Sequence, residues 1–204
     1  MLIYGIWIII LTKAWVYVYN VYGDSMLYSY KELINQGLKR YQIESNTKNK
    51  KLFKVSKGIY SDTENPSELA IVMKKYPNSI LTLHSAFYLH NLTTKKPDVY
   101  SLATDKKAHI IDDSSVNQIF TTRKFFKVGL TAMKVDDSVV NVYDKERLFI
   151  ELIRYRTKLP YTLYKEILDN YRKNRDDINF INLFKYSKLF DKSYITNAII
   201  TEMM

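Results

Sequence analysis

The chain has 204 residues and no cysteine, so disulfides, thiolate zinc sites and cysteine nucleophiles are excluded. Its formal net charge of +10 favours a polyanionic partner, such as nucleic acid, an anionic membrane surface or an acidic protein. The length is sufficient for one or two domains with a hydrophobic core.

Residues 1–23 are almost entirely apolar and carry a single charge, at Lys13. Three interpretations of this stretch are open. The first is a membrane anchor, which the lysine in the middle of the stretch disfavours. The second is β-structure, which the β-branched and aromatic residues favour. The third is that the start codon has been set upstream of the native one. We favour an apolar extension or start-site artefact over residues 1–25, because Met26 begins a self-sufficient domain.

Two short helices are predicted next. The first carries a capping-box pattern, Ser29 with Glu32 three residues on, and Gly37 can adopt the positive φ that the following turn requires. The second is expected to begin near Leu38 and to fray over residues 46–49, which are weak helix formers. We therefore expect two helices joined by a tight turn.

The second helix is expected to have an apolar and a basic side. Leu38, Tyr41 and Ile43 are expected to face the core. The side chains left to face outward are those of Lys39, Arg40, Gln42 and Ser45. This helix therefore offers a polar, positively charged surface.

A two-stranded wing is predicted after the second helix. Residues 52–55 and 58–60 favour short strands, with a turn at Ser56 and Lys57. A helix, a turn, a basic helix and a wing in this order are typical of a winged helix-turn-helix domain. We assign that domain to residues 26–61.

Positive charge is concentrated in this segment. Two acidic residues between Met26 and Tyr60, Glu32 and Glu44, stand against eight basic ones: Lys31, Lys39, Arg40, Lys48, Lys50, Lys51, Lys54 and Lys57. Eight minus two gives a local charge of +6, more than half of the total of +10. Clustering of this kind favours nucleic-acid binding; the alternative interpretation is a solvated lysine-rich face.

The DNA contacts follow from the way a helix-turn-helix docks, with the start of its second helix in the major groove. Arg40 is expected to prefer guanine and Gln42 adenine. Lysines beyond the helix are expected to lie beside the DNA backbone, and the lysines of the wing are expected to contact phosphates or an adjoining minor groove. The predicted DNA-binding residues are Lys39, Arg40, Gln42, Ser45, Lys48, Lys50, Lys51, Lys54 and Lys57.

Residues 62–204 are predicted to form a separate α+β domain with a small sheet and a C-terminal helical segment. A linker over residues 62–66 leads to a helix that Asn65 caps and Pro66 begins. Further helices are expected over residues 83–90, 144–159, 164–171, 180–189 and 194–203. Strands are expected over residues 99–103, 116–121, 130–135 and 139–143, the last two as a hairpin turning at 136–138.

Enzyme signatures are absent from the sequence: there is no P-loop, GxGxxG, GxSxG or HExxH pattern. The three histidines, at positions 84, 90 and 109, lack the spacing of metal ligands on one helix face. The pairs Asp112–Asp113 and Asp136–Asp137 suit loops and turns. We therefore predict no catalytic residue, no cofactor and no metal.

A second set of basic residues lies in the C-terminal helices: Arg147, Arg154, Arg156, Lys158, Lys165, Arg172, Lys173 and Arg175. Acidic residues interleave with them, namely Glu146, Glu151, Glu166 and Asp169. Such mixing usually indicates a solvated helix with pairs at i, i+4, and we favour that interpretation over a functional surface.

The ordered set of segments from Met26 to the end resembles the AbiEi-type antitoxins of bacterial type IV toxin–antitoxin, or abortive infection, systems. The segments are YSYKELINQGLKRYQIES (28–45), KLFKVSKGIYSD (51–62), ELAIVMKKYPNSILTLHSAFYLHNL (68–92), PDVYSLATDK (97–106) and VYDKERLFIELIRYRTKLPYTLYKEI (142–167). One departure from the pattern is that residues 1–25 stand where many winged helix domains carry a further helix.

The resemblance implies a phage-defence antitoxin. Its winged helix-turn-helix would bind double-stranded DNA and repress the promoter of its own operon. Its C-terminal domain would counteract a nucleotidyltransferase toxin without forming a stable complex with it. We accordingly expect a cytoplasmic transcriptional repressor with no membrane partner.

Two other functions are compatible with the same residues. One is a transcriptional regulator or protein-interaction module without an antitoxin role, whose basic segment binds an acidic partner. The other is a regulator tethered to the membrane by residues 1–23.

Overall fold

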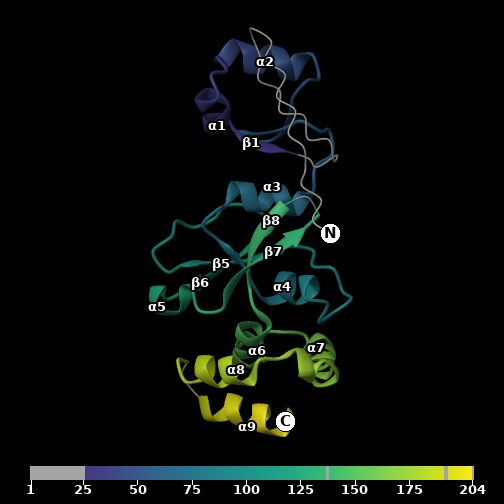
Figure 1. Cartoon of the computed structure of the whole chain (residues 1–204), viewed down its shortest axis with the longest axis vertical. Coiled ribbons are helices and arrows are strands. Elements are labelled where there is room, and N and C mark those ends of the chain that lie inside the picture. Colours follow the sequence, from purple (N-terminus) through teal and green to yellow (C-terminus); the bar gives the residue numbers. More distant parts are fainter. Residues whose placement is uncertain (1–25, 137, 191–192, 204) are drawn as a thin grey trace, which may run out of the picture. The chain divides into compact units, whose positions relative to one another are not determined.

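The computed structural model describes residues 26–136, 138–190 and 193–203, and the chain divides into two compact units between Ser67 and Glu68 (Figure 1). We call them the N-terminal unit and the C-terminal unit. Both combine helices with a sheet, so the predicted α+β class is confirmed. The expectations for residues 1–25 lie outside the described part of the chain.

The N-terminal unit is a small three-stranded sheet with two helices. Its elements in chain order are β1 (Leu27–Ser29), α1 (Tyr30–Asn35), α2 (Arg40–Lys48), β2 (Phe53–Ser56) and β3 (Ile59–Ser61). The strand order is β1-β3-β2, and both pairings are antiparallel. The strand that precedes α1 therefore closes the sheet beside the hairpin that follows α2.

Local sequence signals account for the turn between the two helices. The Ser29 hydroxyl accepts from the Glu32 N–H at 3.2 Å, and the Glu32 carboxylate accepts from the Ser29 N–H at 2.6 Å, which confirms the capping box. Gly37 has φ +92°, as the turn requires. The small core beneath is built from Leu33, Ile43 and Leu52, with Tyr28, Leu38 and Tyr60 packed against it.

Two expectations for α2 were wrong. The helix does not fray over residues 46–49 but continues to Lys48, because the Thr47 hydroxyl donates to the Ile43 carbonyl at 2.9 Å and the Asn49 N–H donates to the Ser45 carbonyl at 2.9 Å. Tyr41 does not face the core; its side chain is 63% exposed. It precedes the buried Ile43 by two residues, which on a helix places it on the opposite side.

A five-stranded mixed sheet forms the centre of the C-terminal unit. Its strands are β4 (Ile80–Leu81), β5 (Tyr100–Asp105), β6 (Val116–Thr121), β7 (Leu130–Val135) and β8 (Ser138–Tyr143), in the order β6-β5-β4-β8-β7. The β4 strand runs antiparallel to β5 and parallel to β8. The predicted hairpin is β7–β8, although residue 137 of its turn lies outside the described chain. Of these five strands only β4 was not predicted, since two residues are too few for a pattern; in the N-terminal unit β1 was not predicted either.

Helices precede, separate and follow the strands of this sheet along the chain. They are α3 (Glu68–Lys75), α4 (Leu83–Leu89), α5 (Arg123–Phe126), α6 (Lys145–Arg154), α7 (Tyr161–Lys173), α8 (Phe180–Ser187) and α9 (Ser193–Met203), with a 3₁₀ turn at Arg175–Asp177. Figure 1 shows α6 to α9 gathered at one end of the sheet. Contrary to expectation, α3 begins at Glu68 rather than Pro66, and α8 ends at Ser187.

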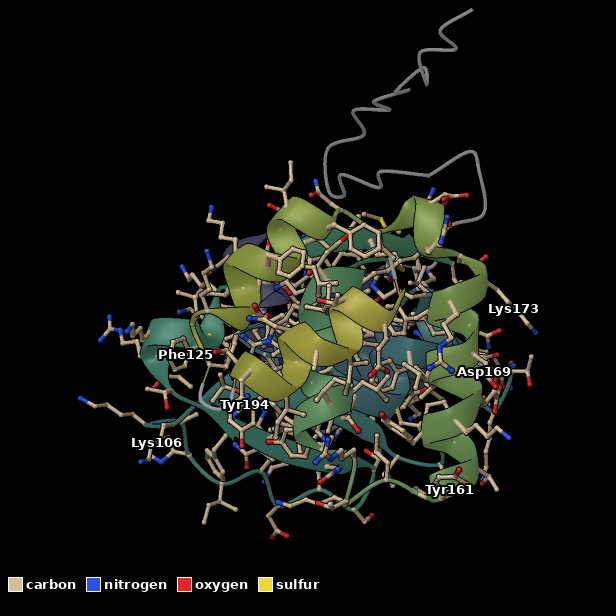
Figure 2. All side chains as sticks on the ribbon, turned by 90° about the horizontal axis from the view of Figure 1, so that it is seen from below. Lys106, Phe125, Tyr161, Asp169, Lys173 and Tyr194 are labelled. Atoms are coloured by element: carbon tan, nitrogen blue, oxygen red, sulfur yellow. The ribbon has the colours of Figure 1, made fainter. Side chains whose placement is uncertain are left out.

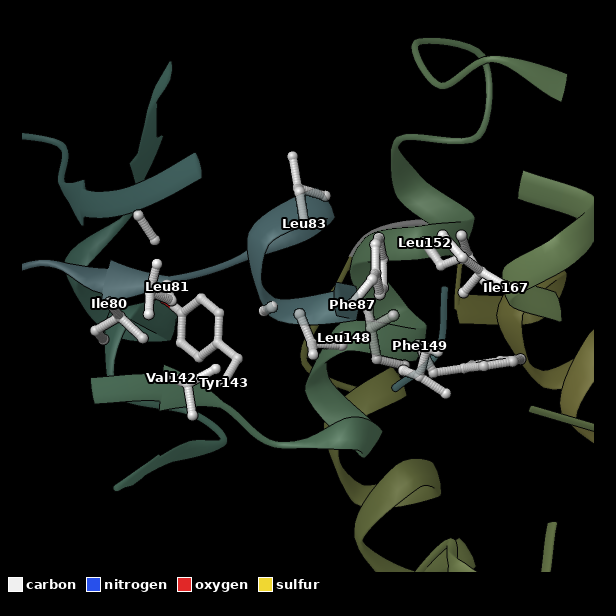
Figure 3. Packing of buried hydrophobic residues seen from close by; sticks show 14 of the residues in the cluster. Ile80, Leu81, Leu83, Phe87, Val142, Tyr143, Leu148, Phe149, Leu152 and Ile167 are labelled. Atoms are coloured by element: carbon white, nitrogen blue, oxygen red, sulfur yellow. The ribbon is translucent and has the colours of Figure 1, made fainter. Parts of the chain in front are cut away.

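One hydrophobic core joins the sheet to these helices. Figure 3 shows Leu81 and Val142 of the sheet, Phe87 of α4, and Leu148 and Phe149 of α6 along a continuous run of buried side chains. The Phe149 ring meets Tyr171 of α7 edge-on, with 5.0 Å between the ring centroids. Among the residues described, no helix is long and apolar enough to cross a membrane.

Arg147 contradicts the expectation of a solvated basic face. Its side chain is fully buried in the first turn of α6, between the sheet and the helices that follow. The interpretation was wrong because helical spacing alone does not reveal that the arginine faces the core.

Candidate nucleic-acid interface

Helical spacing arranges the exposed side chains of α2 in two rows. Ile43 is 1% exposed and fixes the helix against the small core. Arg40, Glu44 and Lys48 recur every four residues, so they form a row along one exposed side of the helix. Tyr41 and Ser45 form a second exposed row beside them. The helix therefore presents a mixed polar and aromatic surface rather than a purely basic one.

A groove of about 720 Å³ separates α2 from the β2–β3 hairpin. Its lining consists of Tyr30, Arg40, Ile43, Glu44, Thr47, Lys48, Lys54 and Tyr60. Three of these side chains are cationic and one is a carboxylate, so the groove has a positive balance. The backbone N–H of Tyr30 donates to the Gly58 carbonyl at 2.8 Å, which ties the start of α1 to the hairpin and holds that side of the groove.

Arg40 and Glu44 interact within the groove. The Arg40 Nε lies 2.9 Å from the Glu44 Oε1, and both side chains are largely exposed. The hydrogen bond with Glu44 raises the pKa of Arg40, and the charge of Glu44 acts in the same direction. An incoming anion must compete with Glu44 for this guanidinium.

The predicted binding residues divide into two groups. Arg40, Lys48 and Lys54 meet in the lining of the groove. The others lie outside that lining: Lys39, Gln42, Ser45, Lys50, Lys51 and Lys57. Sequence spacing could not show which lysines share a concave surface, because Lys54 reaches it from the hairpin.

The residues outside the groove have local roles as well. Gln42 is only partly exposed, and its side-chain oxygen accepts from the Lys39 N–H at 2.8 Å, so it closes the start of α2. Ser45 accepts a long hydrogen bond of 3.4 Å from Asn49. The lysines at positions 39, 50, 51 and 57 are exposed. They remain available to phosphates at the borders of the surface.

Sequence reasoning missed Tyr30, Glu44 and Tyr60 as groove residues. The four-residue spacing from Arg40 through Glu44 to Lys48 was a usable signal for the carboxylate. Tyr30 is the first residue of α1 and Tyr60 is the central residue of β3, and the antiparallel pairing of β3 with β1 and β2 brings them to the groove.

Asp113 and His90 of the C-terminal unit have structural partners. The Asp113 carboxylate accepts from Lys75, from the Tyr76 hydroxyl at 2.9 Å and from the Ser115 hydroxyl at 2.7 Å. His90 Nε2 lies 2.8 Å from the Tyr143 carbonyl oxygen, and burial lowers the pKa of His90. Within residues 26–136, 138–190 and 193–203, no cluster of three or more such side chains could hold a metal ion.

No family model and no curated protein matches the chain.

Proposed function

We propose that the N-terminal unit is a winged helix-turn-helix that binds double-stranded DNA. The proposal is supported by the element order β1-α1-α2-β2-β3 and by the sheet order β1-β3-β2, in which β2 and β3 would be the wing. In such a domain the helix after the turn enters the major groove, and the wing follows the backbone. Here α2 would be the recognition helix.

The observation that carries this proposal is the groove between α2 and the hairpin. Arg40 and Lys48 of the helix and Lys54 of β2 line the same concavity. Phosphate contacts from both elements would fix the register of the domain on a duplex, while α2 reads the base edges. Arg40 would leave Glu44 for a guanine or a phosphate, and the freed carboxylate would suit a cytosine amino group.

We further propose that the whole chain is a cytoplasmic antitoxin that represses its own promoter. The C-terminal unit, with its own sheet and core, would counteract a nucleotidyltransferase toxin without a stable complex. The resemblance of the ordered sequence segments to the AbiEi-type antitoxins supports this step. The division of the chain into two compact units is compatible with separate DNA-binding and antitoxic roles.

Fluorescence anisotropy of the full chain with duplex DNA from its own upstream region tests the DNA-binding step. Exchanging Lys48 and Lys54 for alanine together should weaken binding at least about tenfold and lower the salt slope by about two, because two phosphate contacts are removed. The control exchanges Lys106 and Lys107, two exposed lysines of the C-terminal unit, for alanine.

Equal losses in the two double variants would refute the groove as the interface. Failure of the wild-type chain to shift any duplex, combined with copurification of a stoichiometric acidic protein, would replace the DNA proposal with a protein-interaction function. Neither outcome would bear on the antitoxic role proposed for the C-terminal unit.

Co-expression with the nucleotidyltransferase-like product of a neighbouring gene tests the antitoxic role. The wild-type chain and the Lys48→Ala, Lys54→Ala variant should both restore growth, since the groove would serve repression alone. In the Lys48→Ala, Lys54→Ala variant, we expect repression of a promoter-driven reporter to be lost while rescue of growth is retained. A wild-type chain that gives no rescue would remove the antitoxin proposal and leave a DNA-binding regulator.

A further inference from the structure

The corner between α6 and α7 has an unusual charge pattern. Residues 152–165, LIRYRTKLPYTLYK, contain four basic side chains and no acidic one. Three tyrosines alternate with them, at positions 155, 161 and 164. Cations interleaved with aromatic rings are the composition with which proteins hold single-stranded nucleic acid.

Three of the four cations at this corner are not neutralised. Arg156, Lys158 and Lys165 are exposed, and no carboxylate of the described residues forms an ion pair with them. Arg154 differs, because its guanidinium lies 3.4 Å from Glu151 and 4.8 Å from the centre of the Phe190 ring. Arg156, Lys158 and Lys165 are therefore the cations without a carboxylate partner here, although the Lys158 Nζ also lies 5.3 Å from the centre of the Tyr155 ring.

Two tyrosines stand among these cations. The Tyr161 side chain is 74% exposed at the first position of α7. Burial raises the pKa of the half-buried Tyr164, whereas the charges of Arg156 and Arg172 act to lower it. Tyr161, Lys165 and Arg172 share one face of α7, at spacings of four and seven residues.

The nearest acidic residue of α7 is turned away from this face. The Glu166 carboxylate accepts from the Thr93 hydroxyl at 2.9 Å and from the Thr94 N–H at 3.1 Å. Glu166 is thus engaged with the loop before β5. Further along α7, Asp169 pairs with Arg172 at 3.3 Å. Figure 2 shows Tyr161 and Lys173 at opposite ends of the helix, with the Asp169 and Lys173 side chains directed away from it.

We propose that the α6–α7 corner is a second nucleic-acid site, specific for single strands. Tyr161 stacks on an unpaired base, and Arg156, Lys158 and Lys165 contact the adjoining phosphates. The base faces of a duplex are covered by their neighbours, so an exposed ring gains its stacking partner only from a single strand. The site lies wholly within the C-terminal unit and does not depend on duplex binding by the N-terminal unit.

Anisotropy of the full chain with fluorescein-labelled oligouridylate and oligothymidylate, each of about 15 nucleotides, tests this site. The Tyr161→Ala variant should lose about tenfold in affinity for the single strands, the amount that one stacked base contributes, and should bind duplex unchanged. The Arg156→Ala, Lys165→Ala variant should lose affinity and show a shallower salt dependence. Preference between the two oligomers distinguishes RNA from DNA as the natural strand.

The control is the Lys106→Ala, Lys107→Ala variant, which removes the same charge from another exposed part of the C-terminal unit. Since all the exchanged side chains are exposed, thermal melts of the variants should match the wild type. The proposal is overturned if the wild-type chain binds neither oligomer, or if the control loses as much affinity as the corner variants. It is also overturned if Lys48→Ala, Lys54→Ala alone abolishes single-strand binding, or if polyglutamate binds as tightly as the oligomers.

Discussion

Arg147 and Glu151 form an ion pair that is almost entirely removed from solvent. The Arg147 Nε and Nη2 donate to the Glu151 Oε1 at 2.9 and 2.5 Å, and the two side chains are 0% and 4% exposed. The remaining donor, Nη1, reaches the Phe125 carbonyl at 3.2 Å. The guanidinium also lies 4.8 Å from the Tyr143 ring centre and 4.3 Å from that of Phe190. One side chain thus joins α5, β8, α6 and the segment after α8.

Breaking this pair from either side should destabilise the C-terminal unit strongly. Glu151→Gln leaves the buried Arg147 charge without a carboxylate, which typically costs about 3–5 kcal/mol. Arg147→Met leaves Glu151 with the more distant and partly exposed Arg154 guanidinium, at 3.4 Å, so its cost should lie toward the lower end of that range. The comparison is Arg172→Ala, which removes an exposed pair with Asp169 and should cost less than about 1 kcal/mol. Urea unfolding of the full chain measures both; equal midpoints for Glu151→Gln and Arg172→Ala would contradict the assigned role.

The close approach of Gly129 to α6 gives a second stability prediction. A Cβ at this position would lie 2.4 Å from the Arg147 Cβ and 2.7 Å from an Asp144 carboxylate oxygen, and the residue has φ +73°. Gly129→Ala should therefore cost about 2–4 kcal/mol through overlap and backbone strain. Gly58 has the same φ of +73° but nothing within 4 Å, so Gly58→Ala should cost only about 1–2 kcal/mol. Equal decreases in melting temperature for Gly129→Ala and Gly58→Ala would mean that α6 moves to accommodate the added methyl group.

Asp113 should contribute to the acid sensitivity of the C-terminal unit. The hydrogen bond from Lys75, followed by that from the Ser115 hydroxyl, holds the pKa of Asp113 well below its ordinary value of 3.8. The folded state therefore binds this proton less readily than the unfolded chain. The stabilisation is present above pH 3.8 and is lost as the pH falls below it.

The Asp113→Asn variant isolates this contribution. Its unfolding free energy should fall less than that of the wild type between about pH 5 and pH 2, because the titrating group is gone. Asp112→Asn is the neighbouring control and should follow the wild-type pH profile. Parallel profiles for Asp113→Asn and the wild type would show that the contact with Lys75 does not persist in solution.

Removing the carboxylate of the groove should strengthen DNA binding. Glu44→Gln keeps the size of the side chain but releases Arg40 and removes one negative charge from the lining. An exposed pair is worth up to about 1 kcal/mol, so nonspecific duplex affinity should rise by up to about fivefold, with a steeper salt dependence. Glu32→Gln changes the same charge at the α1 cap, outside the groove, and should leave affinity nearly unchanged. Weaker nonspecific binding by Glu44→Gln would place the interface elsewhere.

Several elements were predictable because their causes are local. The capping box of Ser29 and Glu32 and the turn at Gly37 depend on residues within one or two turns of chain. The strands β6 and β7 have the predicted bounds. Of the groove, the sequence indicated the basic character and three lining cations, Arg40, Lys48 and Lys54.

Other features depend on partners far away in the chain. β4 is only two residues long and exists because β5 and β8 pair with it on either side. Arg147 has the spacing of a solvated i, i+4 pair with Glu151, yet the Phe125 carbonyl and the Phe190 ring enclose it. Tyr41 is exposed because Ile43, two residues further along α2, occupies the buried side of the helix.

The sequence by itself therefore determined the α+β class, the caps and turns, and the concentration of positive charge after Met26. Only the tertiary structure decided which charges share a groove, which are buried and which are free at the α6–α7 corner. The physical reason is that propensity, capping and periodicity act between residues near in sequence. Burial and electrostatic environment depend on side chains that the fold brings together from distant segments. For example, the Glu166 carboxylate is directed away from Lys165 because it accepts hydrogen bonds from Thr93 and Thr94.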